Sequence, residues 1–333
     1  MRIGIVGAGI SGLTAAHCLQ RRHLASPRFL RMLWDIRRFY REGRALLDDG
    51  PETPMLEWLE RRGYSNAFVD DHFLPLLRAV WSANREVAAT FPARFLVRFF
   101  ENHGFLQLRD APRWLTIPGG ARTYVNAILR GFSGDLRLGA AVRSVRRTEA
   151  GPVVTCDGAA PEQFDHLIVA CHADQALALL VDPSELERQT LGAIPYQRNE
   201  AVLHTDEAIM PNLRRTWASW NVHLDDAQAE GACLTYWMNR LQPLGARQSY
   251  FVTLNHTAQI RPERILRVQE YAHPVFTLAG VAAQANHAAL IDHRRTSYAG
   301  AYWRNGFHED GVVSALRVVK RLDSENFLAR EAA

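Results

Sequence analysis

A glycine motif near the start of the chain carries the clearest chemical signal. A short apolar run at residues 3–6 leads into a GxGxxG pattern, and a helical segment rich in small residues follows at 13–19. The pattern consists of Gly7, Ala8, Gly9, Ile10, Ser11 and Gly12. Its glycines permit a tight turn, let a diphosphate approach the backbone and let the helix pack closely on the strand, while the amino end of the helix attracts phosphate. This context predicts dinucleotide binding, and the alternative is a glycine-rich turn that holds no ligand.

The acid that completes such a site is missing from its expected place. A second strand normally ends in Asp or Glu about 20 residues after the last glycine, where the acid binds ribose. Here Ser26 and Pro27 instead give an N-cap and a first helical residue. Asp35 is the only acid near the expected spacing, and it falls inside that helix. The sequence thus predicts an α/β chain with a Rossmann-like lobe that lacks its second strand.

Several other chemistries are excluded by residue usage. Of the 39 Lys and Arg residues, Lys320 is the only lysine, and it lies in a terminal helical segment. A phosphate-binding P-loop and a pyridoxal enzyme each need a lysine in a specific context. The four cysteines are scattered without a CxxC pair, and no HExxH or GxSxG motif occurs. Disulfide frameworks, metal sites and the common hydrolase sites are therefore not expected.

The charge and hydropathy patterns limit the partners and the location. The net charge of +4 includes no basic stripe long enough to indicate nucleic-acid binding. No apolar run approaches the roughly 20 residues that cross a bilayer, and no signal peptide precedes the first strand. We therefore expect a cytoplasmic protein without a transmembrane segment that acts on a small molecule.

Two kinds of segment separate along the chain. Residues 26 to about 110 read as successive helices, with start signals at Ser26, Thr53-Pro54, Ser65 and Pro92 and a stop at Gly104. In the first of them, Phe29, Leu33, Ile36 and Tyr40 mark the face expected to pack on the core. The arginine-rich aromatic helix at 28–44 also resembles a membrane-surface helix, but a solvated face is the simpler interpretation.

Strands dominate from Trp114 onward. The expected strand runs are Leu136–Val145, Val153–Cys156, His166–Ala170, Ala201–His204, Thr216–Val222, Cys233–Met238 and Tyr250–Leu254. The chain then continues through Tyr298–Trp303 and a turn at Asn305-Gly306 into a helix from about Gly311 to Leu322.

These blocks together resemble the FAD-dependent amine oxidase-like flavoproteins. The resemblance rests on the opening glycines, on Ile117-Pro118-Gly119-Gly120, on residues 164–170 and above all on the segment 300–315. It is strongest for a bacterial branch described as NAD/FAD-binding oxidoreductases. It implies noncovalently bound FAD and two lobes, one Rossmann-like and one of mixed helices and sheet for substrate. The FAD-binding lobe would comprise 1–23, 112–192 and 288–333, and the substrate lobe a helical part at 24–111 and a β-rich part at 195–285.

The resemblance also supplies the remaining candidate site residues. Besides the six residues at 7–12, the expected cofactor-binding residues are Val142, Gly300, Glu309, Asp310, Gly311 and Val312. A helix that begins near Gly311 would stabilise negative charge on a reduced flavin, and Glu309 or Asp310 would accept hydrogen bonds from ribityl hydroxyls. The alternative is that Asp310 simply caps its helix.

Two departures from the family pattern affect the function. On the order of 80 residues that include the ribose-binding acid have no counterpart between residues 23 and 26, a difference beyond loop variation. The lysine that many amine oxidases hold near the flavin has no counterpart either, because Lys320 lies in the terminal helix. No catalytic residue is assigned, since hydride transfer needs only a substrate held against the flavin.

The β-rich stretch offers candidates for the substrate pocket, with a packed core as the alternative origin of its aromatic residues. The candidates are Trp217, Trp220, Tyr236, Trp237, Asn239 and His273-Pro274. The predicted function is an FAD-dependent oxidoreductase that takes hydride from an amine or another hydrophobic substrate. The alternatives are a truncated flavoprotein without activity and a nicotinamide-dependent dehydrogenase.

Overall fold

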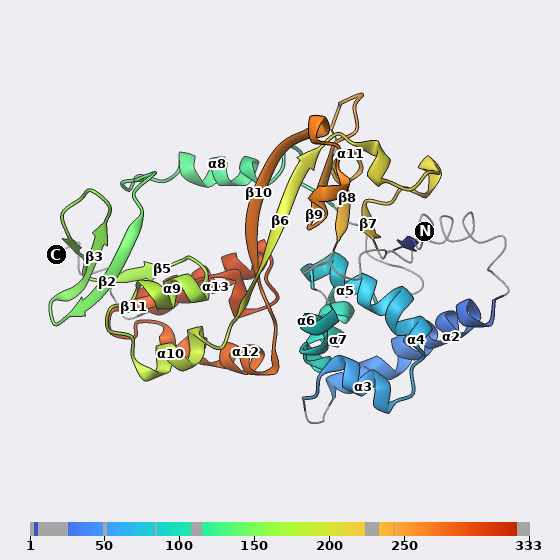
Figure 1. The fold of residues 1–333 in the computed structure, drawn as a ribbon. Helices are drawn as coiled ribbons and strands as arrows, with labels where there is room; N and C mark the ends of the chain where they lie inside the picture. Colours follow the sequence, from blue (N-terminus) through green and yellow to red (C-terminus); the bar gives the residue numbers. More distant parts are fainter. Residues whose placement is uncertain are drawn as a thin grey trace. The chain divides into compact units, whose positions relative to one another are not determined.

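The structure, a computed structural model, describes residues 3–5, 26–48, 52–83, 85–107, 115–223, 233–242 and 244–324. The chain divides into two compact units (Figure 1). The first comprises Met1–Ser133 with Gln197–His273, and the second comprises Gly134–Tyr196 with Pro274–Ala333. None of the described helices is long and apolar enough to cross a membrane.

The first unit begins with a cluster of helices. They are α2 (Pro27–Glu42), α3 (Met55–Arg61), α4 (Asn66–Phe68), α5 (Leu74–Trp81), α6 (Arg85–Ala89) and α7 (Ala93–Asn102), with a π-helical turn at Val69–Phe73. A further helix, α8 (Arg122–Arg130), buries none of its residues and lies apart from this cluster (Figure 1). Phe39 lies among Phe68, Phe73 and Phe100, with ring centroids 5.5, 5.6 and 6.4 Å away. Aromatic packing thus holds α2 against the helices that follow it.

The predicted helix starts are confirmed. Ser26 Oγ accepts a hydrogen bond from Phe29 N at 3.2 Å, and Ser65 Oγ accepts one from Phe68 N at 3.2 Å. Pro54 and Pro92 directly precede α3 and α7. The face assigned to α2 is partly wrong, because the helix buries Asp35, Phe39 and Tyr40 and leaves Leu33 40% exposed. Asp35 turns inward because its Oδ2 accepts hydrogen bonds from Ser65 N and Arg31 Nε.

A six-stranded sheet completes the first unit, in the order β1-β7-β8-β9-β6-β10. The strands are β1 (Ile3–Ile5), β6 (Tyr196–His204), β7 (Trp220–His223), β8 (Leu234–Trp237), β9 (Phe251–Leu254) and β10 (Ile265–Pro274), with the short helix α11 (Met238–Leu241) after β8. The expected runs from Ala201 to Leu254 therefore form strands, whereas β10 was not predicted.

The position of β1 corrects the prediction for the start of the chain. Ile3 and Ile5 pair antiparallel with His223 and Asn221 of β7, at the edge of the six-stranded sheet. We expected this segment in a parallel, Rossmann-like arrangement. An exposed strand edge can pair with any extended apolar segment, and β7 offers such an edge to β1.

The second unit contains two small sheets. Strands β2 (Val142–Thr148), β3 (Gly151–Cys156) and β4 (Glu162–Gln163) form an antiparallel sheet, and β5 (Leu167–Val169) pairs in parallel with β11 (Thr296–Tyr298). The helices are α9 (Ala173–Leu179), α10 (Glu185–Leu191), α12 (Leu278–Ala283) and α13 (His308–Ser324).

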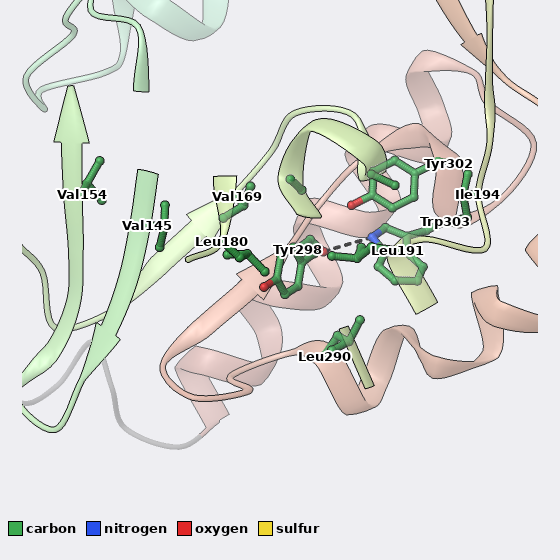
Figure 2. Close-up of a cluster of buried hydrophobic side chains, with 12 residues drawn as sticks. Val145, Val154, Val169, Leu180, Leu191, Ile194, Leu290, Tyr298, Tyr302 and Trp303 are labelled. Atoms are coloured by element: carbon green, nitrogen blue, oxygen red, sulfur yellow. Dashed lines mark hydrogen bonds between the residues drawn. The ribbon is translucent and has the colours of Figure 1, made fainter. Parts of the chain in front are cut away.

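One buried cluster holds these elements together (Figure 2). Its side chains come from both sheets, from the helices and from the loop after β11. They include Val145, Val154, Val169, Leu180, Leu191, Ile194, Leu290, Tyr298, Tyr302 and Trp303. Trp303 Nε1 donates a hydrogen bond to the carbonyl oxygen of Tyr298 at 3.1 Å, which satisfies the indole in the core.

Candidate functional site

The carboxyl ends of β5 and β11 lie side by side in the second unit. Tyr298 pairs with Val169, and Ala299 N donates to the carbonyl oxygen of Val169 at 3.0 Å. The chain leaves β5 through Cys171 and His172 into α9, and it leaves β11 through Gly300 into a 3₁₀ turn. Ligands of α/β proteins bind outside the carboxyl ends of parallel strands. This edge is therefore the candidate site.

The loop after β11 packs tightly against the start of α13. Gly300 N donates to Ser314 Oγ at 2.9 Å, and Ser314 Oγ donates to the carbonyl oxygen of Gly311 at 2.8 Å. A Cβ placed on Gly300 would lie 2.3 Å from the ring of Tyr302, which requires the ring to move. Glycine at position 300 thus lets Tyr302 fold back over the end of β11.

The two predicted acids at the start of α13 have different surroundings. Asp310 is 4% exposed, and its Oδ2 accepts hydrogen bonds from Asn305 N and Phe307 N at 3.2 and 3.0 Å. Its Oδ1 lies 3.6 Å from Arg304 Nε. Glu309 beside it is exposed. Asp310 therefore organises the loop into the helix, as its alternative interpretation proposed, and Glu309 is the acid that faces solvent.

Two polar atoms at this edge, the Tyr302 hydroxyl and His172 Nδ1, are buried without a hydrogen bond among the described residues, although the His172 side chain as a whole is half-buried. Tyr302 is 3% exposed. The ring of His172 stacks on that of Tyr196 at 4.5 Å, and the Tyr196 hydroxyl accepts a hydrogen bond from Ala173 N at 3.0 Å. Buried polar groups are normally paired, so two such groups beside strand ends indicate a ligand.

Burial also sets the protonation states at this edge. It raises the pKa of the Tyr302 hydroxyl far above its usual range, and it raises the pKa of the Cys171 thiol. Both groups are therefore neutral near pH 7, so Tyr302 can donate a hydrogen bond. Sequence reasoning missed Tyr302, His172 and Cys171. Their position directly after apolar strand runs was the signal that could have found them.

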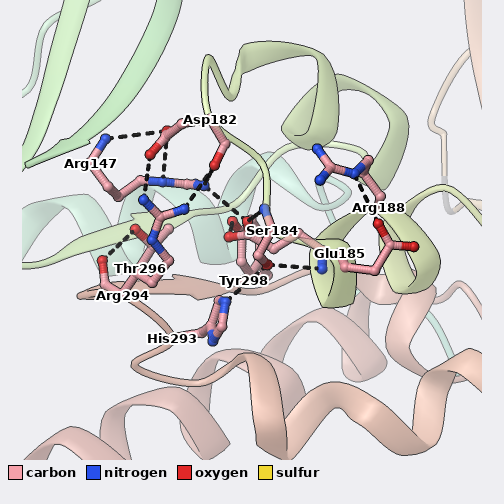
Figure 3. Close-up of polar contacts among 10 residues, drawn as sticks. Arg147, Asp182, Ser184, Glu185, Arg188, His293, Arg294, Thr296 and Tyr298 are labelled. Atoms are coloured by element: carbon pink, nitrogen blue, oxygen red, sulfur yellow. Dashed lines mark hydrogen bonds and ion pairs between the residues drawn. The ribbon is translucent and has the colours of Figure 1, made fainter.

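A buried polar network also holds β11 in place (Figure 3). Glu187 accepts hydrogen bonds from Tyr298 Oη at 2.5 Å and from Arg147 Nη2 at 2.9 Å. It also accepts from Ser184 N at 2.7 Å, which completes a capping box at the start of α10. Burial alone would raise the pKa of Glu187, but these hydrogen bonds and the Arg147 charge outweigh it and lower the pKa. The network thus joins β2, α10 and β11 through one carboxylate.

A serine, a histidine and an aspartate line up beside the same strands. His166 Nε2 lies 3.0 Å from Ser297 Oγ, and His166 Nδ1 lies 3.2 Å from Asp292 Oδ1. Ser297 is fully buried on β11, and its Oγ also accepts a hydrogen bond from Asp292 N. A serine nucleophile must reach its substrate, so this arrangement serves to fix the loop before β11.

The predicted pocket aromatics form two pairs on opposite faces of the six-stranded sheet. Trp220 and Tyr236 pack with Val222, Leu234 and Ala79 of α5. Trp217 and Trp237 pack instead with Phe251 and Met210, and their ring centroids are 5.3 Å apart. Neighbouring strand residues point to opposite faces, so Tyr236 and Trp237 cannot line one cavity. Arg214 lies 4.8 Å over the Trp217 ring.

The remaining predicted site residues lie in different parts of the chain. Residues 7–12 lie outside the described part of the chain. Val142 begins β2 opposite Cys156 of β3 and is 38% exposed. Gly311 approaches the turn after β11, with Ala301 N 3.8 Å from the position of its missing Cβ, and Val312 is 50% exposed. The structure thus brings Gly300, in the loop after β11, close to Asp310 and Gly311 in the first turn of α13.

One comparison with known proteins identifies a family. The family model described as flavin-containing amine oxidoreductase matches residues 40–240, which is more than half of the chain. A search of curated protein sequences gave no significant match.

Solved structures show the same fold at low sequence identity. A cyclohexylamine oxidase from Brevibacterium oxydans has a TM-score of 0.58 and 13% identity, over 91% of this chain and 77% of that one. A CLA-producing fatty acid isomerase from P. acnes has a TM-score of 0.59 and 11% identity, over 96% and 86%. A putrescine oxidase bound to putrescine has a TM-score of 0.60 and 13% identity, over 90% and 76%.

The family match and this α/β architecture agree with each other. The matched range includes β2 to β8, whereas β1, β9, β10, β11 and the loop after β11 lie outside it. The chain belongs to the family of flavin-containing amine oxidoreductases and is an FAD-dependent oxidoreductase.

Proposed function

We propose that the carboxyl edge of β5 and β11 holds the FAD and that the chain takes hydride from an amine or another apolar substrate. The observation that carries this proposal is the buried Tyr302 hydroxyl near the start of α13, which makes no hydrogen bond with any residue that the structure describes. Three features meet there: a loop that contains Gly300, the amino end of a helix, which attracts anions, and a hydrogen-bond donor that could pair with a bound cofactor.

The residues present fit the diphosphate and isoalloxazine end of FAD. The first turn of α13 supplies amides and the positive end of the helix dipole, which favours negative charge on the cofactor. Glu309 is exposed and can accept hydrogen bonds from ribityl hydroxyls, whereas Asp310 holds the loop in shape. His172 and Tyr302 would donate to cofactor oxygens. Gly7, Gly9 and Gly12 remain a prediction for the diphosphate.

FAD, when bound, supplies the hydride acceptor. The chain's own residues bind and orient the cofactor and exclude water from the edge. Tyr302 stays protonated because burial raises its pKa, so it holds a hydrogen-bond donor in place without charge. No lysine lies in this loop, since Lys320 is exposed on α13. We therefore assign no acid or base to the transfer itself.

The substrate class follows from the surroundings of the two aromatic pairs. Trp220 and Tyr236 are half-buried against an apolar cluster, which suits a hydrophobic substrate. Arg214 over Trp217 places a positive charge beside the other pair, which disfavours an ammonium group there. We propose Trp220 and Tyr236 as the residues nearer to an amine or apolar substrate.

FAD binding by the purified full chain tests the proposal. Mixing the chain with FAD should quench flavin fluorescence and give a protein-bound flavin spectrum. Gly300→Ala should abolish both signals, because a methyl group there displaces the Tyr302 ring. Gly245→Ala is the matched control, because nothing lies within 4 Å of a Cβ at that position, and it should bind FAD as the wild type does.

Tyr302→Phe separates binding from folding. It removes a buried hydroxyl that has no partner, so the chain without FAD should be as stable as the wild type or more stable. The same change should weaken FAD binding about fivefold, the effect of one hydrogen bond. A wild type that binds no FAD would favour a remnant without activity, and tighter binding of NAD(P)H would favour a dehydrogenase. Either result overturns the proposal.

A further inference from the structure

An exposed apolar face of α2 has no role in the flavin site. Leu30, Leu33 and Trp34 are 54%, 40% and 53% exposed. These residues lie at helical spacing with Arg37 and Arg41, so all five share one face about 100° wide. The opposite face buries Asp35 and Phe39 in the helical cluster. The helix is thus anchored on one side and presents an aliphatic and aromatic strip on the other.

Arginine surrounds this strip. The guanidinium carbons of Arg31 and Arg38 lie 4.8 and 5.5 Å from the Trp34 ring centroid, so two cations flank one exposed indole. Over its length α2 carries five arginines and two acidic residues. Of those acids, Asp35 is fully buried, and Glu42 pairs with Arg38 at 2.9 Å. Arg28 also pairs with Asp71 at 2.8 Å and Arg31 with Asp35 at 3.2 Å, so the solvent side of α2 keeps a moderate net positive charge, to which Arg37 and Arg41 contribute.

We propose that this face of α2 docks on an anionic phospholipid surface. Leu30, Leu33 and Trp34 would enter the boundary between headgroups and acyl chains, where indole rings are favoured. Arg37 and Arg41 would bind phosphate oxygens, for which the planar guanidinium is suited. The apolar residues and the cations lie on one strip, so both contacts form in one orientation of the helix.

Charge argues against the other common occupant, a second copy of this chain. An isologous contact would bring the arginines of two copies of α2 against each other, and like charges across an interface are unfavourable. Anionic lipid complements the same charges. The simpler interpretation of this helix, a solvated face with its apolar residues turned to the core, fails because Leu33 and its neighbours are exposed.

Vesicle binding by the full chain tests the proposal. The chain should sediment with vesicles of phosphatidylglycerol and phosphatidylcholine, sediment much less with phosphatidylcholine alone, and be released by salt. Leu33→Glu should weaken the binding at least tenfold. The control is Leu213→Glu, which makes the same change at a leucine that is 42% exposed elsewhere, and it should bind as the wild type does.

Two further variants locate the contact. Arg37→Gln and Arg41→Gln should each weaken binding about fivefold, the effect of one cation near an anionic surface. Lipids with brominated acyl chains should quench the wild type more than Trp34→Phe. The proposal is overturned if the wild type ignores anionic vesicles or if Leu33→Glu binds like its control. It is also overturned if Leu33→Glu leaves vesicle binding unchanged and instead abolishes self-association or the binding of an acidic protein.

Discussion

At the scale of single residues, the carboxylate of Glu187 connects three elements of the second unit. Glu187 receives hydrogen bonds from Tyr298, Arg147 and Ser184, which belong to β11, to β2 and to the start of α10. Since all three contacts favour the ionised form, Glu187 links the position of β11 to protonation. The proposed flavin site begins at Gly300, two residues after Tyr298, so the geometry of that loop would depend on this acid.

We predict that Glu187→Gln lowers the free energy of unfolding by about 3 kcal/mol near pH 7, because it leaves buried Arg147 short of a charge partner. The pKa of Glu187 is lowered in the folded chain, so the stability it contributes is present above its ordinary pKa of 4.5 and is lost as pH falls through the lowered value. Urea unfolding at several pH values measures both effects. The difference between wild type and variant should shrink below pH 4.5.

Tyr298→Phe provides the control for this interpretation. It keeps the carboxylate but removes one hydrogen-bond donor, so the pKa of Glu187 should rise and stability should be lost at a higher pH than in the wild type. An unfolding free energy of Glu187→Gln that runs parallel to the wild type at every pH would contradict the assignment.

At the scale of elements, a row of polar side chains crosses the six-stranded sheet. His204 Nε2 lies 2.7 Å from Thr253 Oγ1, which lies 2.8 Å from Thr235 Oγ1, and Thr235 lies 2.8 Å from His223 Nε2. Asp206 N donates to His204 Nδ1, so the proton of the neutral ring is on Nε2. Burial lowers the pKa of His204 to about 4. The row therefore joins β6, β9, β8 and β7, and His204 takes part in it as a neutral ring.

We predict that Thr253→Val destabilises the chain by about 2 kcal/mol, because it leaves buried groups of His204 and Thr235 without partners. Thr253→Ser keeps the hydroxyl and should cost much less. Urea unfolding at pH 7 compares the two variants. Equal losses for valine and serine would show that methyl packing, and not the polar row, carries the effect.

The sequence predicts elements better than it predicts their neighbours. Helix starts at Ser26, Pro54 and Ser65 follow from local capping chemistry, which short spacing reveals. The pairing of β1 with β7 and the burial of Asp35 depend on contacts between distant segments, which no local pattern contains. At the proposed site, the glycines and acids at 300–311 belong to the segment on which the family resemblance rests, so the sequence could single them out. His172 belongs to no motif, and Tyr302 lies within the 300–315 segment without being singled out there. The proposed role of both residues depends on the two strand ends lying side by side.

At the scale of the whole molecule, the second unit, where we propose that FAD binds, has little sheet of its own. Among the described strands, the parallel sheet consists of β5 and β11, and Ile168 in the middle of β5 is 43% exposed. A two-stranded sheet is marginal by itself, so the stability of this unit depends on the buried cluster around Tyr298 and Trp303. Cofactor binding should therefore stabilise this unit considerably.

We predict that FAD at about 100 times its dissociation constant adds about 2.7 kcal/mol to the stability of the folded chain. Hydrogen exchange with and without FAD should show added protection at residues 299–311 and little change in α2–α7. Thermal unfolding over a range of FAD concentrations provides the second measurement. Protection confined to the helical cluster, with none at 299–311, would place the cofactor elsewhere.

Lys320, the single lysine of the chain, is exposed on α13, so an amine-reactive dye can label this helix. Lys320 follows Asp310 by ten positions, which corresponds to about 15 Å along the helix axis. An amine-reactive fluorophore also reacts with the α-amino group of the chain. Among the side chains, however, it would label Lys320 alone. Energy transfer from that dye to flavin would report occupancy of the proposed pocket in real time, without any engineered cysteine.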